Sequence, residues 1–224
     1  MKKYIYLLSL LFTSFQSSAK IEGESSLVLK SVISRYERLG NWKAKFTQHI
    51  HSVGLNSGNF SQGIFYFVEP GNFLYSLKGP EYSDFVSNGK KAWHIKYPGG
   101  PKGTPEAKIF SDVRKLDLNR YLLFLRGFKG ASANDLSSID KDFKVEGKKQ
   151  GETLILTLEP KGESDISQIR LVFLNSVEAP SEVNITDLLG TTTKIKITSF
   201  EKIKKPDMKL FQPDLPKNAK IQHL

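Results

Sequence analysis

The sequence of residues 60–97 is FSQGIFYFVEPGNFLYSLKGPEYSDFVSNGKKAWHIKY, and this stretch decides the fold. It holds 10 of the 25 aromatic residues of the chain. Turn signals at 69–72 (EPGN) and 88–89 (NG) divide it into strand-like runs in which bulky residues recur at alternate positions. Because alternate residues of a strand share one face of a sheet, the pattern predicts a continuous apolar wall. Such a wall is either an ordinary core or the lining of a lipid cavity.

The first 19 residues have the pattern of a cleaved export signal. Two lysines precede an apolar run over 4–15, which is too short to span a bilayer, and small residues precede Ala19. We therefore expect cleavage after Ala19 and a single soluble domain over 20–224. The chain has no cysteine, so neither a disulfide nor a lipid anchor on a cysteine is available.

The chain is strongly basic. Its formal charge is +10, and removal of the two lysines of the signal leaves +8. An anionic partner, such as a membrane surface or an acidic protein, would explain this excess, and so would a general need for solubility. No nucleic-acid-binding motif is present in the sequence.

Hydrophobic spacing predicts the order of the elements. Helices are expected over 25–40 and 117–126, the second apolar on nearly all sides, and a further helical turn over 132–139. Strands are expected over 44–50, 59–68, 72–78, 83–88, 91–97, 142–147, 152–159, 166–174, 181–187 and 192–203. Segment 107–113 is ambiguous, and the tail from 204 is expected to be extended. Because strands and helices do not alternate, the prediction is an α+β fold, in which one mainly antiparallel sheet of about ten strands curls around the helices.

No catalytic constellation is evident. His49 and His51 are two apart on an expected strand, where a third ligand could complete a metal site, but the lysine and threonine before them indicate its solvent face. The acidic residues beside the turns form no recognisable pair. We therefore expect no enzyme, no metal and no cofactor, and an envelope hydrolase that uses the loop 98–105 is the remaining enzymatic alternative.

Five motifs occur in an order that is similar to one family. They are AKFTQ at 44–48, Gly63 with EPGNF at 69–73, SNGKKAW at 87–93, ITDLLGTTT at 185–193, and Phe211-x-Pro213 with Pro216. Together they resemble the LolA family of periplasmic lipoprotein carriers over nearly all of residues 20–224. Glu69 departs from the family pattern, in which many members have a basic residue that is thought to hold a lid shut, and Asn88 replaces the usual Asp.

The resemblance implies an unclosed half-barrel of about ten to eleven antiparallel strands, with lid helices over a hydrophobic cavity. It also implies a monomeric, non-enzymatic carrier in the periplasm. Such a carrier takes acylated lipoproteins from an inner-membrane ABC transporter to the outer membrane, where a receptor would accept them. A binding protein for another anionic lipid or glycolipid is the alternative. The residues expected to line the acyl-binding cavity are Phe46, Phe65, Phe67, Phe73, Tyr75, Phe85, Trp93, Ile95, Tyr97, Leu122, Phe124 and Leu125.

Overall fold

The computed structural model describes residues 21–53, 58–80, 82–112, 133–174 and 178–224. The elements are α1 (Gly23–Glu37), β1 (Trp42–His51), β2 (Asn59–Val68), β3 (Asn72–Lys78), β4 (Tyr82–Asn88), β5 (Ala92–Tyr97), β6 (Glu106–Phe110), α3 (Ser137–Asp142), β7 (Phe143–Gln150), β8 (Thr153–Pro160), β9 (Ile166–Leu174), β10 (Glu182–Asp187), β11 (Thr192–Lys202), η2 (Met208–Phe211) and β12 (Lys220–His223).

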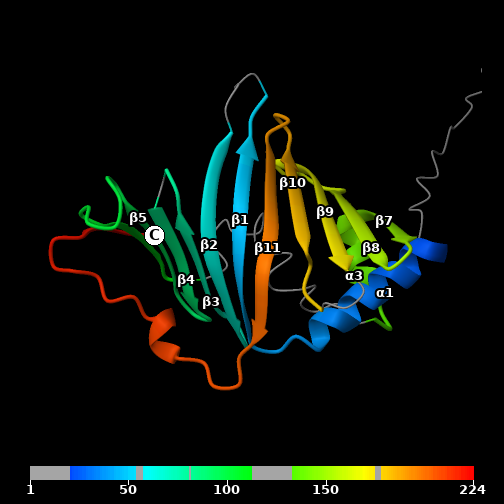
Figure 1. The fold of residues 1–224 in the computed structure, drawn as a ribbon, viewed down its shortest axis with the longest axis horizontal. Helices are drawn as coiled ribbons and strands as arrows, with labels where there is room; N and C mark the ends of the chain where they lie inside the picture. The colour runs from blue at the N-terminus through cyan, green and yellow to red at the C-terminus, as the bar shows by residue number, and fades with distance from the viewer. Residues whose placement is uncertain (1–20, 54–57, 81, 113–132, 175–177) are drawn as a thin grey trace, which may run out of the picture.

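In the described chain, one sheet of 12 strands has the order β12-β6-β5-β4-β3-β2-β1-β11-β10-β9-β8-β7 (Figure 1). Neighbouring strands are antiparallel except at one end, where β12 runs parallel to β6. The pairing of β1 with β11 joins the N-terminal and C-terminal halves of the chain. Because β7 and β12 stand at opposite ends of this order, the sheet is unclosed. The predicted unclosed, mainly antiparallel fold is thus confirmed.

Most predicted strands agree with the observed ones within a few residues. The ambiguous segment forms β6, and the tail that was expected to be extended contains η2 and β12. The predicted helical turn before β7 corresponds to α3. The predicted signal over 1–19 and the predicted helix over 117–126 lie outside the described residues.

The two faces of the sheet carry different hydrophobic clusters. The face that carries α1 and the main cluster is called the inner face here, and the other the outer face. On β1, the alternation of buried and more exposed side chains produces this division, with Ala44 and Phe46 buried on the inner face and Lys45 exposed on the outer one.

Helix α1 covers one end of the sheet, where it contacts β7 and β8 (Figure 1). Its buried side chains, such as Val28 and Val32, join the main cluster. Ser25 Oγ accepts a hydrogen bond from the backbone N–H of Gly147 at 3.0 Å, and Glu24 Oε1 accepts one from that of Lys149 at 2.8 Å. Because β7 is an edge strand, these side chains satisfy donors that would otherwise be open to pairing with another chain.

The C-terminal tail covers the outer face at the opposite end. Element η2 contacts β3 and β4, and Phe211 is almost fully buried. Further on, Leu215 packs against the smaller cluster of Val86, Ile95 and Ala107. The chain then turns back to lay β12 beside β6.

Candidate functional site

A row of rings crosses four strands on the inner face. Phe65 on β2, Tyr75 on β3, Phe85 on β4 and His94 on β5 are direct cross-strand partners. The ring centroids are 6.3 Å apart for Phe65 and Tyr75 and 6.3 Å for Tyr75 and Phe85, both edge-on. Phe85 and His94 stack at 4.0 Å. This unbroken chain of contacts is called the aromatic row.

Burial changes along the aromatic row. Phe65 is 0% exposed and Tyr75 is 3% exposed, whereas Phe85 and His94 are both only half-buried. The apolar surface therefore runs from the core of the protein to a place that solvent reaches.

Strand β1 supports the buried end of the row. Phe46 stacks on Tyr75 at a centroid distance of 4.9 Å and lies over Gly63, its cross-strand partner on β2. A Cβ at Gly63 would lie 2.1 Å from Cζ of Phe46, so only glycine leaves room for the ring. Gln48 Oε1 accepts a hydrogen bond from the Tyr75 hydroxyl at 2.6 Å. The A-x-F-x-Q motif thus places one aromatic ring and one polar anchor under the row.

Phe67 and Phe73 form a further buried pair beside the aromatic row. They are cross-strand partners on β2 and β3, and both belong to the main cluster. Six of the predicted cavity residues therefore lie together on the inner face: Phe46, Phe65, Phe67, Phe73, Tyr75 and Phe85.

The prediction that Trp93, Ile95 and Tyr97 belong to the same wall is wrong. The register of β4 and β5 pairs Val86 with Trp93 and Phe85 with His94, so these three residues lie on the outer face. The reason is the tight turn after Asn88, which matches odd positions of β4 with even positions of β5. The remaining predicted cavity residues, Leu122, Phe124 and Leu125, lie outside the described residues.

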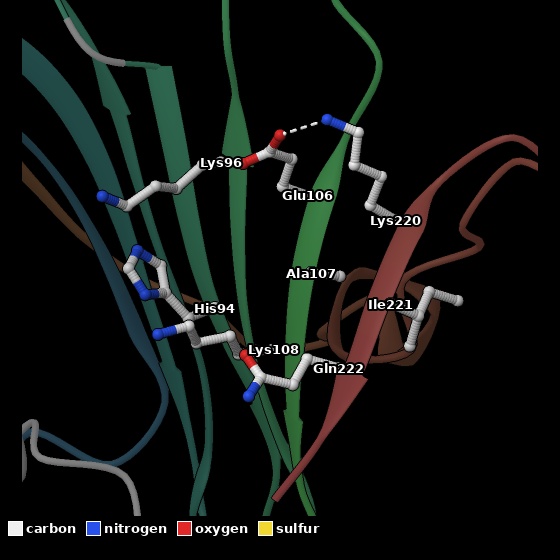
Figure 2. Close-up of a pocket in the computed structure, with 8 residues that line it drawn as sticks. All are labelled: His94, Lys96, Glu106, Ala107, Lys108, Lys220, Ile221 and Gln222. Atoms are coloured by element: carbon white, nitrogen blue, oxygen red, sulfur yellow. Dashed lines mark hydrogen bonds and ion pairs between the residues drawn. The ribbon is translucent and has the colours of Figure 1, made fainter.

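The open end of the aromatic row borders a pocket of about 460 Å³ that the sequence did not predict (Figure 2). It is lined by His94, Lys96, Glu106, Ala107, Lys108, Lys220, Ile221 and Gln222. Lys220 Nζ is 2.8 Å from Glu106 Oε1. No local signal could have revealed this pocket, because it depends on parallel pairing between β6 and β12, which are far apart in sequence.

The surroundings of His94 in this pocket favour the neutral form of its imidazole. Burial, reinforced by the positive charges of Lys96 and Lys108, lowers the pKa of His94 to about 4. The hydrogen bond and charge of Lys220 lower the pKa of Glu106, so this carboxylate is ionised at neutral pH.

The metal candidates of the sequence do not meet a third ligand in the part of the chain that the structure describes. His49 and His51 are exposed on β1. Within the described ranges, no group of three His, Asp or Glu side chains could hold a metal ion. Among the same residues, no helix is long and apolar enough to cross a bilayer.

Comparisons with known proteins agree with the family resemblance that the sequence motifs indicate. The family model "Outer membrane lipoprotein carrier protein LolA" matches residues 131–214. A protein of Psychromonas ingrahamii named outer-membrane lipoprotein carrier protein is 32% identical over 93 residues, which cover 42% of this chain and 44% of that protein. Proteins of the same name are 25% identical in Legionella pneumophila (strain Paris), over 97% of both chains, and 23% identical in Shewanella frigidimarina, over 99% of this chain and 96% of that one. The predicted resemblance to the LolA family is confirmed.

Solved structures that this chain matches include the LolA superfamily protein NE2245 from Nitrosomonas europaea. It is 10% identical and covers 85% of this chain and 98% of its own, with a TM-score of 0.44. The MucA/MucB complex of Pseudomonas aeruginosa matches with 10% identity and a TM-score of 0.44, over 86% of this chain and 62% of that one.

Proposed function

We propose that this chain, a relative of the outer-membrane lipoprotein carriers, is itself a periplasmic carrier of acylated lipoproteins. It binds their acyl chains on the inner face of the sheet, receives them from an inner-membrane ABC transporter and delivers them to the outer membrane, where a receptor protein accepts them. The proposal includes no catalytic step. The observation that supports it most directly is the aromatic row, which extends the core to a half-exposed ring.

The energetics of acyl chains explain why such a surface is needed. Burial of one methylene is worth about 0.8 kcal/mol, so one chain of about 16 carbons represents roughly 12 kcal/mol. A lipoprotein with two or three such chains does not leave a membrane for water without an apolar partner. Rigid aromatic rings suit this task, because they present a large apolar area with few rotatable bonds.

The proposed acyl-binding residues are the six inner-face aromatics named above, together with Leu122, Phe124 and Leu125 from the predicted lid. Phe85 is the most informative of them. It is half-buried, so its removal changes the accessible surface without emptying the core. By contrast, Phe73 is 0% exposed, and a substitution there would test stability rather than binding.

A release assay tests the carrier role. Spheroplasts with labelled new lipoproteins are incubated with the protein purified from the periplasmic fraction, and the supernatant is scored for lipoprotein bound to it. The expected result is a one-to-one soluble complex. Absence of release, with a fatty-acyl probe still bound, would overturn the carrier role and leave another lipid as ligand. Loss of both would mean that the aromatic row is ordinary core.

A pair of variants tests the face assignment. Phe85→Ala should weaken binding of a fatty-acyl probe about tenfold, because a large apolar contact is lost. Trp93→Ala, which removes a still larger ring system from the outer face, should leave the dissociation constant within about twofold. The reverse order of effects would contradict the assignment of the inner face as the binding surface.

A further inference from the structure

The aromatic row continues into a second, polar row without a gap. The register carries it from Phe85 on β4 to His94 on β5, Lys108 on β6 and Gln222 on β12. A parallel row beside it contains Lys96, Glu106 and Lys220. Figure 2 shows the His94 ring and the side chains of Lys96 and Lys108 directed to the same side of the sheet. The end of the row therefore changes from apolar to cationic within one strand spacing.

The charges of this pocket do not cancel. Three lysines line it, and Glu106 is the single acidic residue among its lining residues. Glu106 is paired with Lys220 at 2.8 Å. Among the described residues, neither Lys96 nor Lys108 has a carboxylate within ion-pair distance. Glu106 therefore offsets part of the positive charge of Lys220 and Lys96, its cross-strand partner, and the described lining residues of the pocket keep an excess of positive charge.

His94 lies between the aromatic row and the cationic pocket and is part of both. Its ring stacks on Phe85 at 4.0 Å, which continues the apolar surface. His94 also lines the pocket together with the two lysines, where a neutral imidazole can donate one hydrogen bond without adding charge. The same side chain can therefore contact an acyl chain and the polar group attached to it.

We propose that this cationic pocket binds the acidic group, a phosphate or a carboxylate, of a ligand whose acyl chains lie on the aromatic row. The inference rests on the proposed acyl-binding function and adds the class of ligand: an anionic amphiphile, held in one direction. Lysine ammonium groups bind such oxyanions as compact point charges. A volume of about 460 Å³ lies within the range of small-ligand sites and accommodates a phosphate group with its glycerol.

The register of the strands determines the direction in which the proposed ligand lies. An acyl chain gains from the apolar row, whose accessible ring is the half-buried Phe85, whereas the acidic group gains from Lys96 and Lys108 beyond it. The opposite orientation would place an anion against fully buried rings, which costs several kcal/mol unless it is paired. The two ends of the row therefore select both the ligand class and its direction.

Two probes with the same acyl chain separate the two proposals. Palmitoyl-lysophosphatidylglycerol carries a phosphate, and monopalmitoylglycerol is uncharged. Both are titrated by calorimetry against the purified protein at low salt, below their micelle concentrations. The expected result is that the anionic probe binds at least about tenfold more tightly, and that this difference shrinks as salt is added. Equal affinities would overturn the anion site and leave the acyl-binding function intact, whereas no binding of either probe would overturn both.

Substitutions of the pocket lysines test whether the anionic probe binds in this pocket. Lys96→Gln combined with Lys108→Gln should weaken binding of the anionic probe about tenfold and leave the neutral probe within about twofold. Lys45→Gln, an exposed lysine on the outer face of β1, is the matched control and should change neither. If the control weakens binding as much as the double variant, the effect comes from net charge and the proposed pocket is wrong.

Inorganic phosphate distinguishes a lipid head group from a free anion. Phosphate alone should bind weakly and should compete with the anionic probe but not with the neutral one. If phosphate binds as tightly as the lysophospholipid, the acyl chain contributes nothing, and the proposed amphiphile is excluded as the ligand.

Discussion

The substitution Gly63→Ala tests the packing under the aromatic row most directly. Gly63 lies on the inner face of β2 opposite Phe46, whose ring covers it. A Cβ would lie 2.1 Å from Cζ of Phe46 and 2.6 Å from the backbone oxygen of Ser76. The ring could move only by leaving its stacked position 4.9 Å from Tyr75, and the backbone of β3 cannot move without breaking the sheet.

The packing around Gly63 determines how much stability the substitution should remove. Extra atoms in a well-packed core cost about 1–3 kcal/mol, and loss of a stacked ring pair adds about 0.5–1.5 kcal/mol. Gly63→Ala should therefore lower the free energy of unfolding by about 2–4 kcal/mol. For a domain of this size, the melting temperature should fall by roughly 5–15 °C.

Denaturant unfolding followed by circular dichroism measures this difference. Gly162→Ala is the matched control, because a Cβ there meets nothing within 4 Å, and it should stay within about 0.5 kcal/mol of the wild type. The double variant with Phe46→Leu should be less destabilised than the sum of the single variants, since leucine vacates the space that the new methyl needs. A Gly63→Ala protein as stable as wild type would refute the packing described for Phe46.

Three further predictions concern other parts of the fold. Gly147→Ala should destabilise the protein by about 1–3 kcal/mol in thermal unfolding, because the new Cβ would lie 2.7 Å from Cβ of Val28 on α1. Phe211→Ala should cost about 3–5 kcal/mol in denaturant unfolding, because this ring is 1% exposed beneath the C-terminal tail, and a cost below about 1 kcal/mol would contradict its burial. The pKa of His94 is lowered to about 4 from an ordinary 6.5, so the free energy of unfolding should decrease as pH falls from 6.5 to 4. His94→Gln should flatten the measured pH dependence in that window.

The strands of the first half could be predicted because their signals are local. The turns at 69–72 and 88–89 fix the ends of β2 and β4 and the starts of β3 and β5, and alternation on β1 correctly separates Ala44 and Phe46 from Lys45. The inner face of β2 to β4 could be predicted for the same reason: its bulky residues occupy alternate positions, and their cross-strand partners are also bulky.

Side-chain size alone could not predict which residues of β5 lie on the inner face. Both faces of this strand are apolar at some positions, because the C-terminal tail covers the outer one, where Leu215 contacts the cluster of Ile95. The prediction that Trp93 faces inward rested on the alternation of Trp93, Ile95 and Tyr97, which shows that they share a face but not which face it is. Counting residues across the turn after Asn88 would have corrected it, since a two-residue loop pairs Val86 with Trp93.

The graded burial of the aromatic row suits a carrier better than a deep closed pocket would. A site that recovered the full transfer energy of each acyl chain, roughly 12 kcal/mol for about 16 carbons, would hold its ligand too tightly to pass it on. Along the row the rings change from fully buried at Phe65 to half-exposed at Phe85, so the part of the row that an acyl chain can contact lies at the Phe85 end, beside solvent. In the proposed carrier, this geometry would limit the affinity for the acyl chain. A receiving membrane that buries the whole chain then offers a lower free energy, and transfer needs no chemical step in the protein.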